Sequence, residues 1–213
     1  MDKIGDTINR LFELQEDLLR EFQEAEIIER EIYSAINYDN HATGVIGLRG
    51  VGKTTLLLRE SLINGAISRE SLYISADDIA MQDFKLIDIV EFLYKQLGIK
   101  KVYVDEIHKY ENWMQELKNI ADRYAEMKVV FTSSSAIDLI HSKYDLSRRV
   151  SFINLPGLSF REYLYFKHQI SIPKCELEDI ISNPAEANTK LLNAVAQPLA
   201  EMNNYLESGY YPF

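Results

Sequence analysis

The chain has 213 residues, a length that accommodates one α/β domain and a small additional unit. Hydrophobic residues make up 46% and charged residues 26% of the chain, which excludes a protein dominated by disorder. The formal net charge of −10 disfavours non-specific binding to nucleic acid or anionic lipid, because an acidic surface is repelled by phosphate groups.

Cysteine content and hydropathy indicate the compartment. Cys175 is the one cysteine in the sequence, so neither an intramolecular disulfide nor a cysteine-based zinc site is expected. The first twenty residues include Asp2, Asp6, Glu13 and Glu16, and no apolar signal-peptide core fits there. No run of eighteen apolar residues occurs in the sequence. We therefore expect a cytoplasmic protein that makes no membrane contact.

The N-terminal segment, residues 4–36, has the periodicity of one long amphipathic helix. Apolar residues recur there at helical spacing, namely Ile4, Ile8, Leu11, Leu18, Phe22, Ala25, Ile32 and Ile36. Gln15 and Glu29 interrupt this stripe. Two interpretations remain: the helix packs on its own domain, or it binds a partner protein.

The middle of the chain alternates between strands and helices. Apolar runs predict strands at residues 43–46, 72–75, 102–104, 128–131 and 150–153. Helical periodicity separates them, with clear apolar stripes at residues 84–97 and 113–124. This order predicts βαβ units and a mostly parallel five-stranded sheet.

Beyond Pro156 the pattern is helical. Ser159 and Glu162 have capping-box spacing, and further helices are expected at 176–182, 186–196 and 199–206. We divide the chain into an N-terminal helical segment (1–36), a core (37–156) and a helical extension (157–213).

A glycine-rich loop follows the first expected strand. Gly47 to Thr54 match the phosphate-binding pattern G-x-x-x-x-G-K-[ST], in which backbone N–H groups point inward at a phosphate. The following helix adds its positive end at the same place. The match lies between an apolar strand and an apolar helix, as this mechanism requires, so a chance glycine-rich turn is the weaker alternative.

Two side chains of this loop have expected roles. Lys53 supplies a positive charge to the β- and γ-phosphates, and the Thr54 hydroxyl is a ligand for Mg²⁺. The expected nucleotide-binding set comprises Gly47, Arg49, Gly50, Val51, Gly52, Lys53, Thr54 and Thr55.

Two carboxylates follow the third expected strand. Asp105 and Glu106 come directly after the run 101–104, which carries them to the carboxyl edge of the sheet, where α/β proteins bind ligands. Asp105 is expected to hold Mg²⁺ and Glu106 to polarise the attacking water. The alternative is a solvated acidic strand end, which the phosphate-binding loop upstream makes less attractive. We assign His108 no catalytic role.

These motifs resemble the AAA+ superfamily of P-loop ATPases, and more narrowly a prokaryotic AAA-type family whose members usually carry a C-terminal nuclease-like domain. The narrower resemblance rests on the stretches 47–55, 105–108, 132–135, 155–164 and 205–213. It implies ATP rather than GTP, and a P-loop NTPase three-layer sandwich with strand order 5-1-4-3-2. The chain stops where this family normally continues, so the nuclease-like domain is expected to be missing and residues 157–213 to be the start of a lid.

The same resemblance implies two further catalytic groups. Ser134 or Thr132 would be the sensor at the end of the fourth strand, with a helix N-cap as the alternative role for Ser134 and Ser135. Arg149 would be an arginine finger supplied to a neighbouring subunit, although Arg148 blurs the assignment and a solvent-facing arginine is the alternative.

Three functions fit these features. The first is an ATPase that uses Mg²⁺ to drive a conformational change in itself or a partner, with a homo-oligomer as one assembly. The second is a nucleotide-gated binding module with negligible turnover, which binds a protein through its N-terminal helix or C-terminal end. The third is a P-loop kinase, which ranks last because residues 156–213 contain Arg161 as their one arginine.

Overall fold

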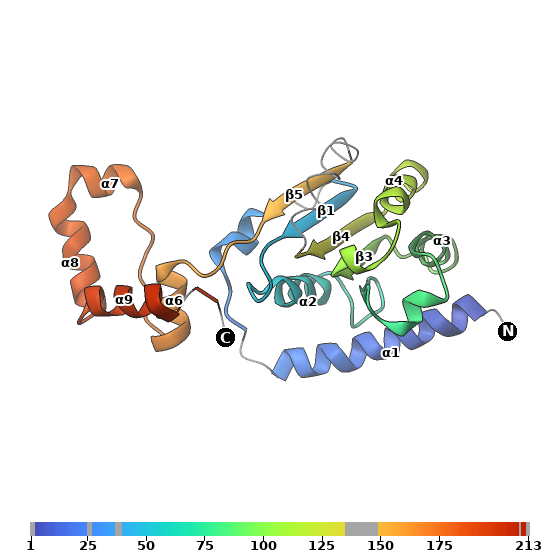
Figure 1. Cartoon of the computed structure of the whole chain (residues 1–213), viewed down its shortest axis with the longest axis horizontal. Coiled ribbons are helices and arrows are strands. Elements are labelled where there is room, and N and C mark those ends of the chain that lie inside the picture. Colours follow the sequence, from blue (N-terminus) through green and yellow to red (C-terminus); the bar gives the residue numbers. More distant parts are fainter. Residues whose placement is uncertain (1–2, 25–26, 37–39, 135–148, 209, 212–213) are drawn as a thin grey trace. The chain divides into compact units, whose positions relative to one another are not determined.

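The structure is a computed structural model that describes residues 3–24, 27–36, 40–134, 149–208 and 210–211. The chain divides into two compact units, Met1–Leu155 and Pro156–Phe213 (Figure 1). Each unit is described by itself.

A five-stranded parallel sheet forms the centre of the first unit. Its strands are β1 (Ala42–Ile46), β2 (Leu72–Ser75), β3 (Lys101–Asp105), β4 (Lys128–Ser133) and β5 (Val150–Asn154). They lie in the order β2-β3-β4-β1-β5, and every neighbouring pair is parallel (Figure 1). The α/β class and the predicted strand order are therefore confirmed. β4 separates the carboxylate strand β3 from β1, the strand that leads into the phosphate-binding loop.

Alternation along the strands sends side chains to two different layers. The connecting helices are α2 (Lys53–Ile63), α3 (Leu86–Gln96) and α4 (Trp113–Arg123). Val102 and Val104 of β3 belong to one hydrophobic core with Leu93 of α3 and Leu117 of α4. Tyr103 points the other way, and its hydroxyl donates a hydrogen bond to the carbonyl of Glu60 in α2 at 3.2 Å. The sheet thus has an apolar face and a face that carries polar groups toward α2.

The N-terminal helix is shorter than predicted. α1 covers Lys3–Glu24, and a short 3₁₀ helix, η1 (Glu31–Ala35), follows it, so the expectation of one helix over 4–36 is wrong. Arg30 has extended backbone angles, φ −95° and ψ 142°. Local periodicity is overridden here by tertiary contacts, because Glu29 and Arg30 bind α2 and the phosphate-binding loop.

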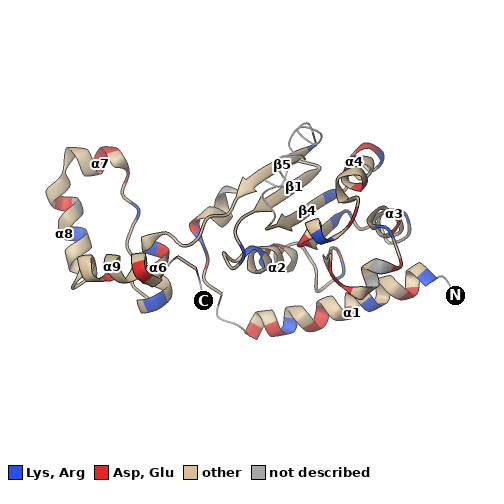
Figure 2. Cartoon of the chain, viewed as in Figure 1, with Lys and Arg blue, Asp and Glu red and all other residues tan. Residues whose placement is uncertain are grey.

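α1 packs on its own domain. Its apolar side contacts β2, α2 and α3, with Ile8, Leu11, Phe12 and Leu19 buried. Acidic residues, with a few basic residues between them, lie along the rest of the helix (Figure 2). The apolar stripe is therefore used inside the first unit.

Gln15, which interrupts the apolar stripe, has a structural role. It is only 1% exposed, and its side-chain amide donates to the carbonyls of Ala66 and Ser71 at 2.8 and 3.3 Å. Its side-chain oxygen accepts from the backbone N–H of Tyr73 in β2. Because β2 is an edge strand, this amide supplies the hydrogen bonds that a further strand would otherwise make.

The second unit is a small helical assembly. Its helices are α6 (Phe160–His168), α7 (Leu177–Ser182), α8 (Pro184–Ala194) and α9 (Pro198–Ser208). The predicted capping box is present, since the Ser159 hydroxyl accepts from Glu162 N at 3.2 Å and Ser159 N donates to Glu162 Oε2 at 2.7 Å. The core of this unit consists of Leu158, Tyr163, Leu164 and Val195.

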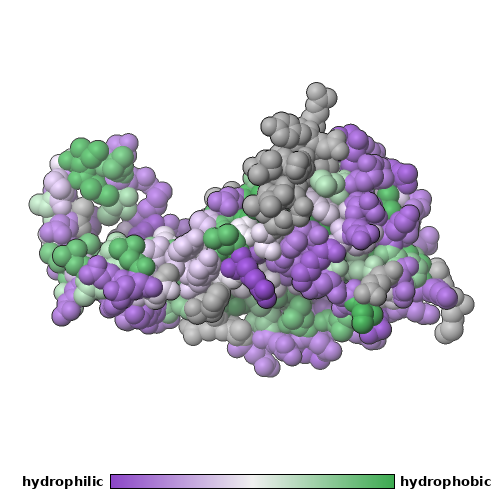
Figure 3. All heavy atoms as spheres, in the orientation of Figure 1, coloured by the Kyte–Doolittle hydropathy of each residue, from purple (hydrophilic) through white to green (hydrophobic). Residues whose placement is uncertain are grey.

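Apolar side chains also remain at the surface of this second unit (Figure 3). The exposed large ones on its last three helices are Leu177, Ile180, Ile181, Leu192, Leu199 and Leu206. None of the helices in the described part of the chain combines the length and apolarity that crossing a bilayer requires.

Candidate functional site

The phosphate-binding loop, residues 47–52, connects β1 to α2. Gly50 and Gly52 have φ angles of 86° and 95°, which L-amino acids with a side chain rarely adopt. A Cβ atom on Gly47 would lie 2.5 Å from the Leu155 carbonyl oxygen, so the chain passes too closely there for a side chain. Gly52 is the N-cap of α2, and the loop therefore ends at the positive end of the helix.

The other members of the expected nucleotide-binding set differ in exposure. Val51 is buried, with 1% exposure, and acts as a packing residue of the loop. Arg49 and Thr54 are exposed, and Thr55 is half-buried. The two polar side chains that open α2 are thus a buried Lys53 and an exposed Thr54.

Lys53 is the buried cation of the site. It is 4% exposed, its Nζ donates to the carbonyl oxygen of Leu48 at 3.0 Å, and it lies 3.7 Å from Glu106 Oε1. Burial lowers the pKa of Lys53 from its usual value, and the negative charges of Glu106 and Asp105 oppose that shift. The ammonium group is therefore partly desolvated and held by one carbonyl and one carboxylate.

The Asp105 carboxylate accepts hydrogen bonds from three hydroxyl groups, each of which belongs to a different element. Thr54 Oγ1 donates to Asp105 Oδ2 at 2.7 Å, and the Tyr73 hydroxyl donates to the same oxygen at 3.1 Å. Thr132 Oγ1 donates to the other oxygen, Oδ1. The carboxylate is 5% exposed, and these hydrogen bonds stabilise its charge inside the protein. The structure thus places the two predicted Mg²⁺ ligands, Thr54 and Asp105, in direct contact.

Glu106 occupies an unusual backbone conformation at the end of β3. Its φ and ψ are 50° and 43°, in the left-handed region that few residues other than glycine adopt. Its backbone N–H donates to Thr132 Oγ1 at 2.8 Å. The turn directs the carboxylate toward Lys53 rather than back along the strand.

Ser134 and His108 hold the second oxygen of this carboxylate. Ser134 Oγ donates to Glu106 Oε2 at 2.8 Å, and His108 Nε2 lies 3.4 Å from the same oxygen and 3.5 Å from Ser134 Oγ. Among the described residues, none forms a hydrogen bond with the buried Nδ1 of His108. The histidine therefore belongs to the site, which the sequence did not indicate. The alternative cap role for Ser134 and Ser135 concerns residues 136–140, which lie outside the described residues, as does Arg148.

Arg149 is the one expected catalytic residue that lies away from this cluster. Its carbonyl accepts from Ala42 N at the start of β1, whereas the phosphate-binding loop follows the end of β1. Five strand residues separate the two ends, roughly 16 Å at the usual rise per residue. The guanidinium forms two hydrogen bonds with Asp122, at 2.7 and 3.0 Å.

The structure adds two contacts that the sequence did not indicate. Arg30, 6% exposed, donates to the Val51 carbonyl at 3.0 Å and so fixes the loop from the segment after α1. Tyr73 donates to Asp105 from β2. A signal existed for Tyr73, because Tyr73-x-Ser75 and Tyr103-x-Asp105 alternate with apolar residues and thus predict one polar face. Arg30 has no comparable signal.

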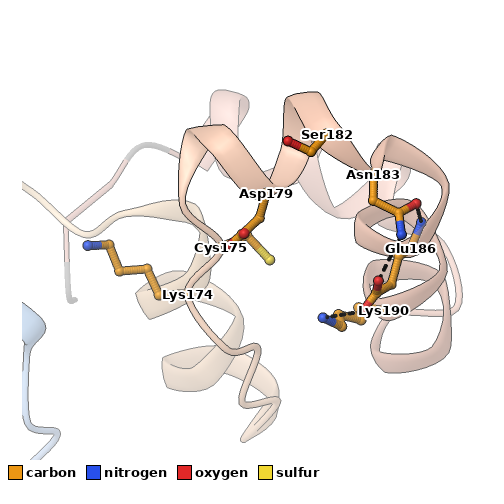
Figure 4. Close-up of a pocket in the computed structure, with 7 residues that line it drawn as sticks. All are labelled: Lys174, Cys175, Asp179, Ser182, Asn183, Glu186 and Lys190. Carbon is orange, nitrogen blue, oxygen red and sulfur yellow. Dashed lines mark hydrogen bonds and ion pairs between the residues drawn. The ribbon is translucent and has the colours of Figure 1, made fainter.

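A hollow of about 270 Å³ lies in the helical unit between α7 and α8 (Figure 4). Its lining residues are Lys174, Cys175, Asp179, Ser182, Asn183, Glu186 and Lys190. All of them except Cys175 are exposed, and Glu186 already bonds Lys190 and Asn183. This hollow is an open space between helices, and it lacks the convergent buried polar groups found around Asp105.

The sequence matches a known family over most of the α/β unit. A family described as "AAA domain" matches residues 39–164. An uncharacterized protein of Methanocaldococcus jannaschii is 32% identical over 179 residues, which cover 78% of this chain and 37% of that protein. The chain therefore spans little more than a third of the length of this relative.

Solved structures with a similar fold include two nucleotide-bound proteins. The Hsp104–ADP complex of S. cerevisiae is 16% identical, with 75% of this chain and 28% of that chain covered and a TM-score of 0.49. AMPPCP-bound DnaA from Aquifex aeolicus is 18% identical, with 76% and 58% covered and a TM-score of 0.45.

Proposed function

The chain belongs to the AAA domain family and is an ATP-binding protein of the AAA type, and from this premise we propose that it hydrolyses ATP with Mg²⁺. The nucleotide phosphates bind at residues 47–54, against the backbone N–H groups and Lys53. Hydrolysis drives a conformational change in the protein or in a partner. Residues 157–213 are the start of a lid in this proposal.

The position of Glu106 carries the proposal. One carboxylate oxygen lies 3.7 Å from the ammonium group that binds the γ-phosphate, and the other is held by Ser134 at 2.8 Å. A carboxylate at this place can accept a proton from a water molecule beside the γ-phosphate. Ser134, in the sensor role, keeps the base oriented.

The side chains beside the loop also fit a magnesium ion. Mg²⁺ prefers oxygen ligands, and the Thr54 hydroxyl and Asp105 carboxylate are oxygen donors 2.7 Å apart. The bound ion would neutralise charge on the β- and γ-phosphates. Thr132 and Tyr73 orient Asp105 from β4 and β2.

The decisive experiment compares phosphate release by the wild type and by Glu106→Gln. General-base catalysis contributes on the order of 10²- to 10⁴-fold, so we expect turnover to fall by at least about 100-fold. ATP affinity, measured by calorimetry, should remain close to that of the wild type because Lys53 and the loop are unchanged. Equal turnover in the two proteins would reject Glu106 as the base.

A nucleotide-gated binding module is the second candidate, and the location of Arg149 favours it for an isolated chain. This arginine lies at the opposite end of β1 from the phosphates, so one chain does not bring it to its own site. We propose that Arg149 acts in the site of a neighbouring copy. ATP binding with no phosphate release at any protein concentration would support the binding module instead.

A further inference from the structure

We propose that Tyr73 is a positioning residue for the magnesium site, whose buried hydroxyl holds the Asp105 carboxylate in the orientation that the ion requires. This inference rests on the proposed function. Tyr73 lies in β2, an edge strand outside both the phosphate-binding loop and the Asp105–Glu106 pair.

Tyr73 and Thr54 donate to the same oxygen of the Asp105 carboxylate. Asp105 Oδ2 accepts hydrogen bonds from Thr54 at 2.7 Å and from Tyr73 at 3.1 Å. Thr54 is itself expected to bind the ion through a lone pair of its hydroxyl oxygen, which leaves its proton for Asp105. Tyr73 supplies the second donor to Oδ2 from β2, without being an expected ligand of the ion.

Tyr73 is fixed in place by burial and by its backbone contact. The residue is 7% exposed, and its backbone N–H donates to the buried side chain of Gln15. The hydroxyl is thus held beside the carboxylate and donates to Asp105 Oδ2 at 3.1 Å.

Tyr73 and Thr132 donate hydrogen bonds to a side chain that is expected to bind the metal ion. Partners that hydrogen-bond to a ligating side chain fix its orientation, and their loss typically weakens metal binding by roughly 10- to 100-fold. Thr132 fills this role for Oδ1, and Tyr73 fills it for Oδ2. Both oxygens of Asp105 are then held by groups other than the metal.

Tyr73→Phe is the direct test, because it removes the hydroxyl and keeps the ring. A fluorescent ATP analogue is titrated with Mg²⁺, and Mn²⁺ binding to the protein–nucleotide complex is followed by electron paramagnetic resonance. We expect the metal to bind about 10-fold more weakly. Affinity for the analogue in EDTA should stay at the wild-type value.

Tyr103→Phe provides a matched control. Tyr103 pairs with Tyr73 across the β2–β3 ladder and is 3% exposed, but its hydroxyl donates to the Glu60 carbonyl and not to Asp105. The control should bind Mg²⁺ as the wild type does. Unchanged metal binding by Tyr73→Phe, or an equal loss in both variants, would overturn the role of Tyr73. A wild type whose nucleotide binding ignores Mg²⁺ would instead overturn the proposed function.

Discussion

In the proposed function, Lys53 stabilises bound nucleotide at a cost to the nucleotide-free protein. It is 4% exposed, and burial lowers its pKa, which means that the folded state holds the charged form less favourably than water does. The negative charges of Glu106 and Asp105 oppose this shift. A bound triphosphate would add further negative charge beside the ammonium group.

Lys53→Met therefore should separate stability from function. A charge–hydrogen-bond contact contributes about 1.5–3 kcal/mol, so affinity for ATP should fall by roughly 10- to 100-fold in calorimetry. The melting temperature without nucleotide should not fall, because the lowered pKa of Lys53 means that its charged form is a net cost to the folded state, and methionine removes that cost.

The pH dependence follows from the direction of this pKa shift. The free-energy cost of burying the charged Lys53 side chain is fully present below the pKa that Lys53 has in the folded protein. This cost disappears as the pH rises to 10.5, the usual pKa of a lysine. The stability difference between Lys53→Met and the wild type should therefore be largest near neutral pH and shrink toward pH 10.5. A melting temperature well below that of the wild type at pH 7 would contradict this account.

Residues in contiguous motifs could be assigned from the sequence, whereas residues that act through long-range contacts could not. The sequence predicts that Thr54 and Asp105 both bind Mg²⁺, because each residue belongs to a short pattern with a known geometry. Tyr73 acts across 32 residues of sequence and Arg30 across 21, and neither belongs to such a pattern. The sequence predicts no role for His108, because a lone histidine has no diagnostic spacing.

At the scale of elements, the joining of α1 to the β2 edge depends on one buried amide. Gln15 accepts from the Tyr73 backbone N–H and donates to two carbonyls, so an apolar replacement leaves buried backbone groups unpaired. An unsatisfied buried group costs about 1–3 kcal/mol. This cost would destabilise the whole β2 edge, because β2 is an outer strand of the described sheet.

Gln15→Leu should lower the free energy of unfolding by about 1–3 kcal/mol in urea denaturation, although it makes the helix stripe more apolar. Gln23→Leu, on an exposed position of the same helix, should change it by no more than about 0.5 kcal/mol. A stabilised Gln15→Leu protein would show that the stripe, not the amide, joins α1 to the sheet.

Periodicity gave the type of most elements but not all of their boundaries. The strand order is confirmed because βαβ rules and the family resemblance restrict the topology strongly. The helix over 4–36 was too long because Glu29 binds Arg59 and Arg30 binds Val51, and hydropathy contains neither contact. β4 extends to Ser133, two residues beyond the apolar run, because its polar end still pairs with β1.

At the scale of the whole molecule, we propose that the site of one chain receives a positive charge from a neighbouring copy. Among the described residues, Lys53 lies 3.7 Å from Glu106, while Arg149 lies at the other end of β1, paired with Asp122. A finger that acts on a neighbouring copy would add the second positive charge during hydrolysis. Turnover would then depend on assembly. This chain, whose net charge is −10, would hydrolyse ATP only at an interface between two copies.

Subunit mixing tests this arrangement. Arg149→Ala and Lys53→Ala should each lose at least about 100-fold in phosphate release, since an arginine finger contributes on the order of 10³- to 10⁵-fold. A mixture of the two should regain activity, because an intact loop of one variant meets an intact Arg149 of the other. Asp122→Asn, which weakens the ion pair but keeps the arginine, should remain active.

Lys53 and Glu106, which act together within one chain, provide the control for this experiment. A mixture of Lys53→Ala with Glu106→Gln should stay inactive, because Lys53 and Glu106 lie 3.7 Å apart within one chain and no neighbour can complete the pair. Recovery in the Arg149 mixture alone would therefore locate the finger between copies. If the Arg149 mixture stays as inactive as its components while Asp122→Asn loses activity as well, Arg149 acts through the Asp122 ion pair, as a structural residue of its own chain.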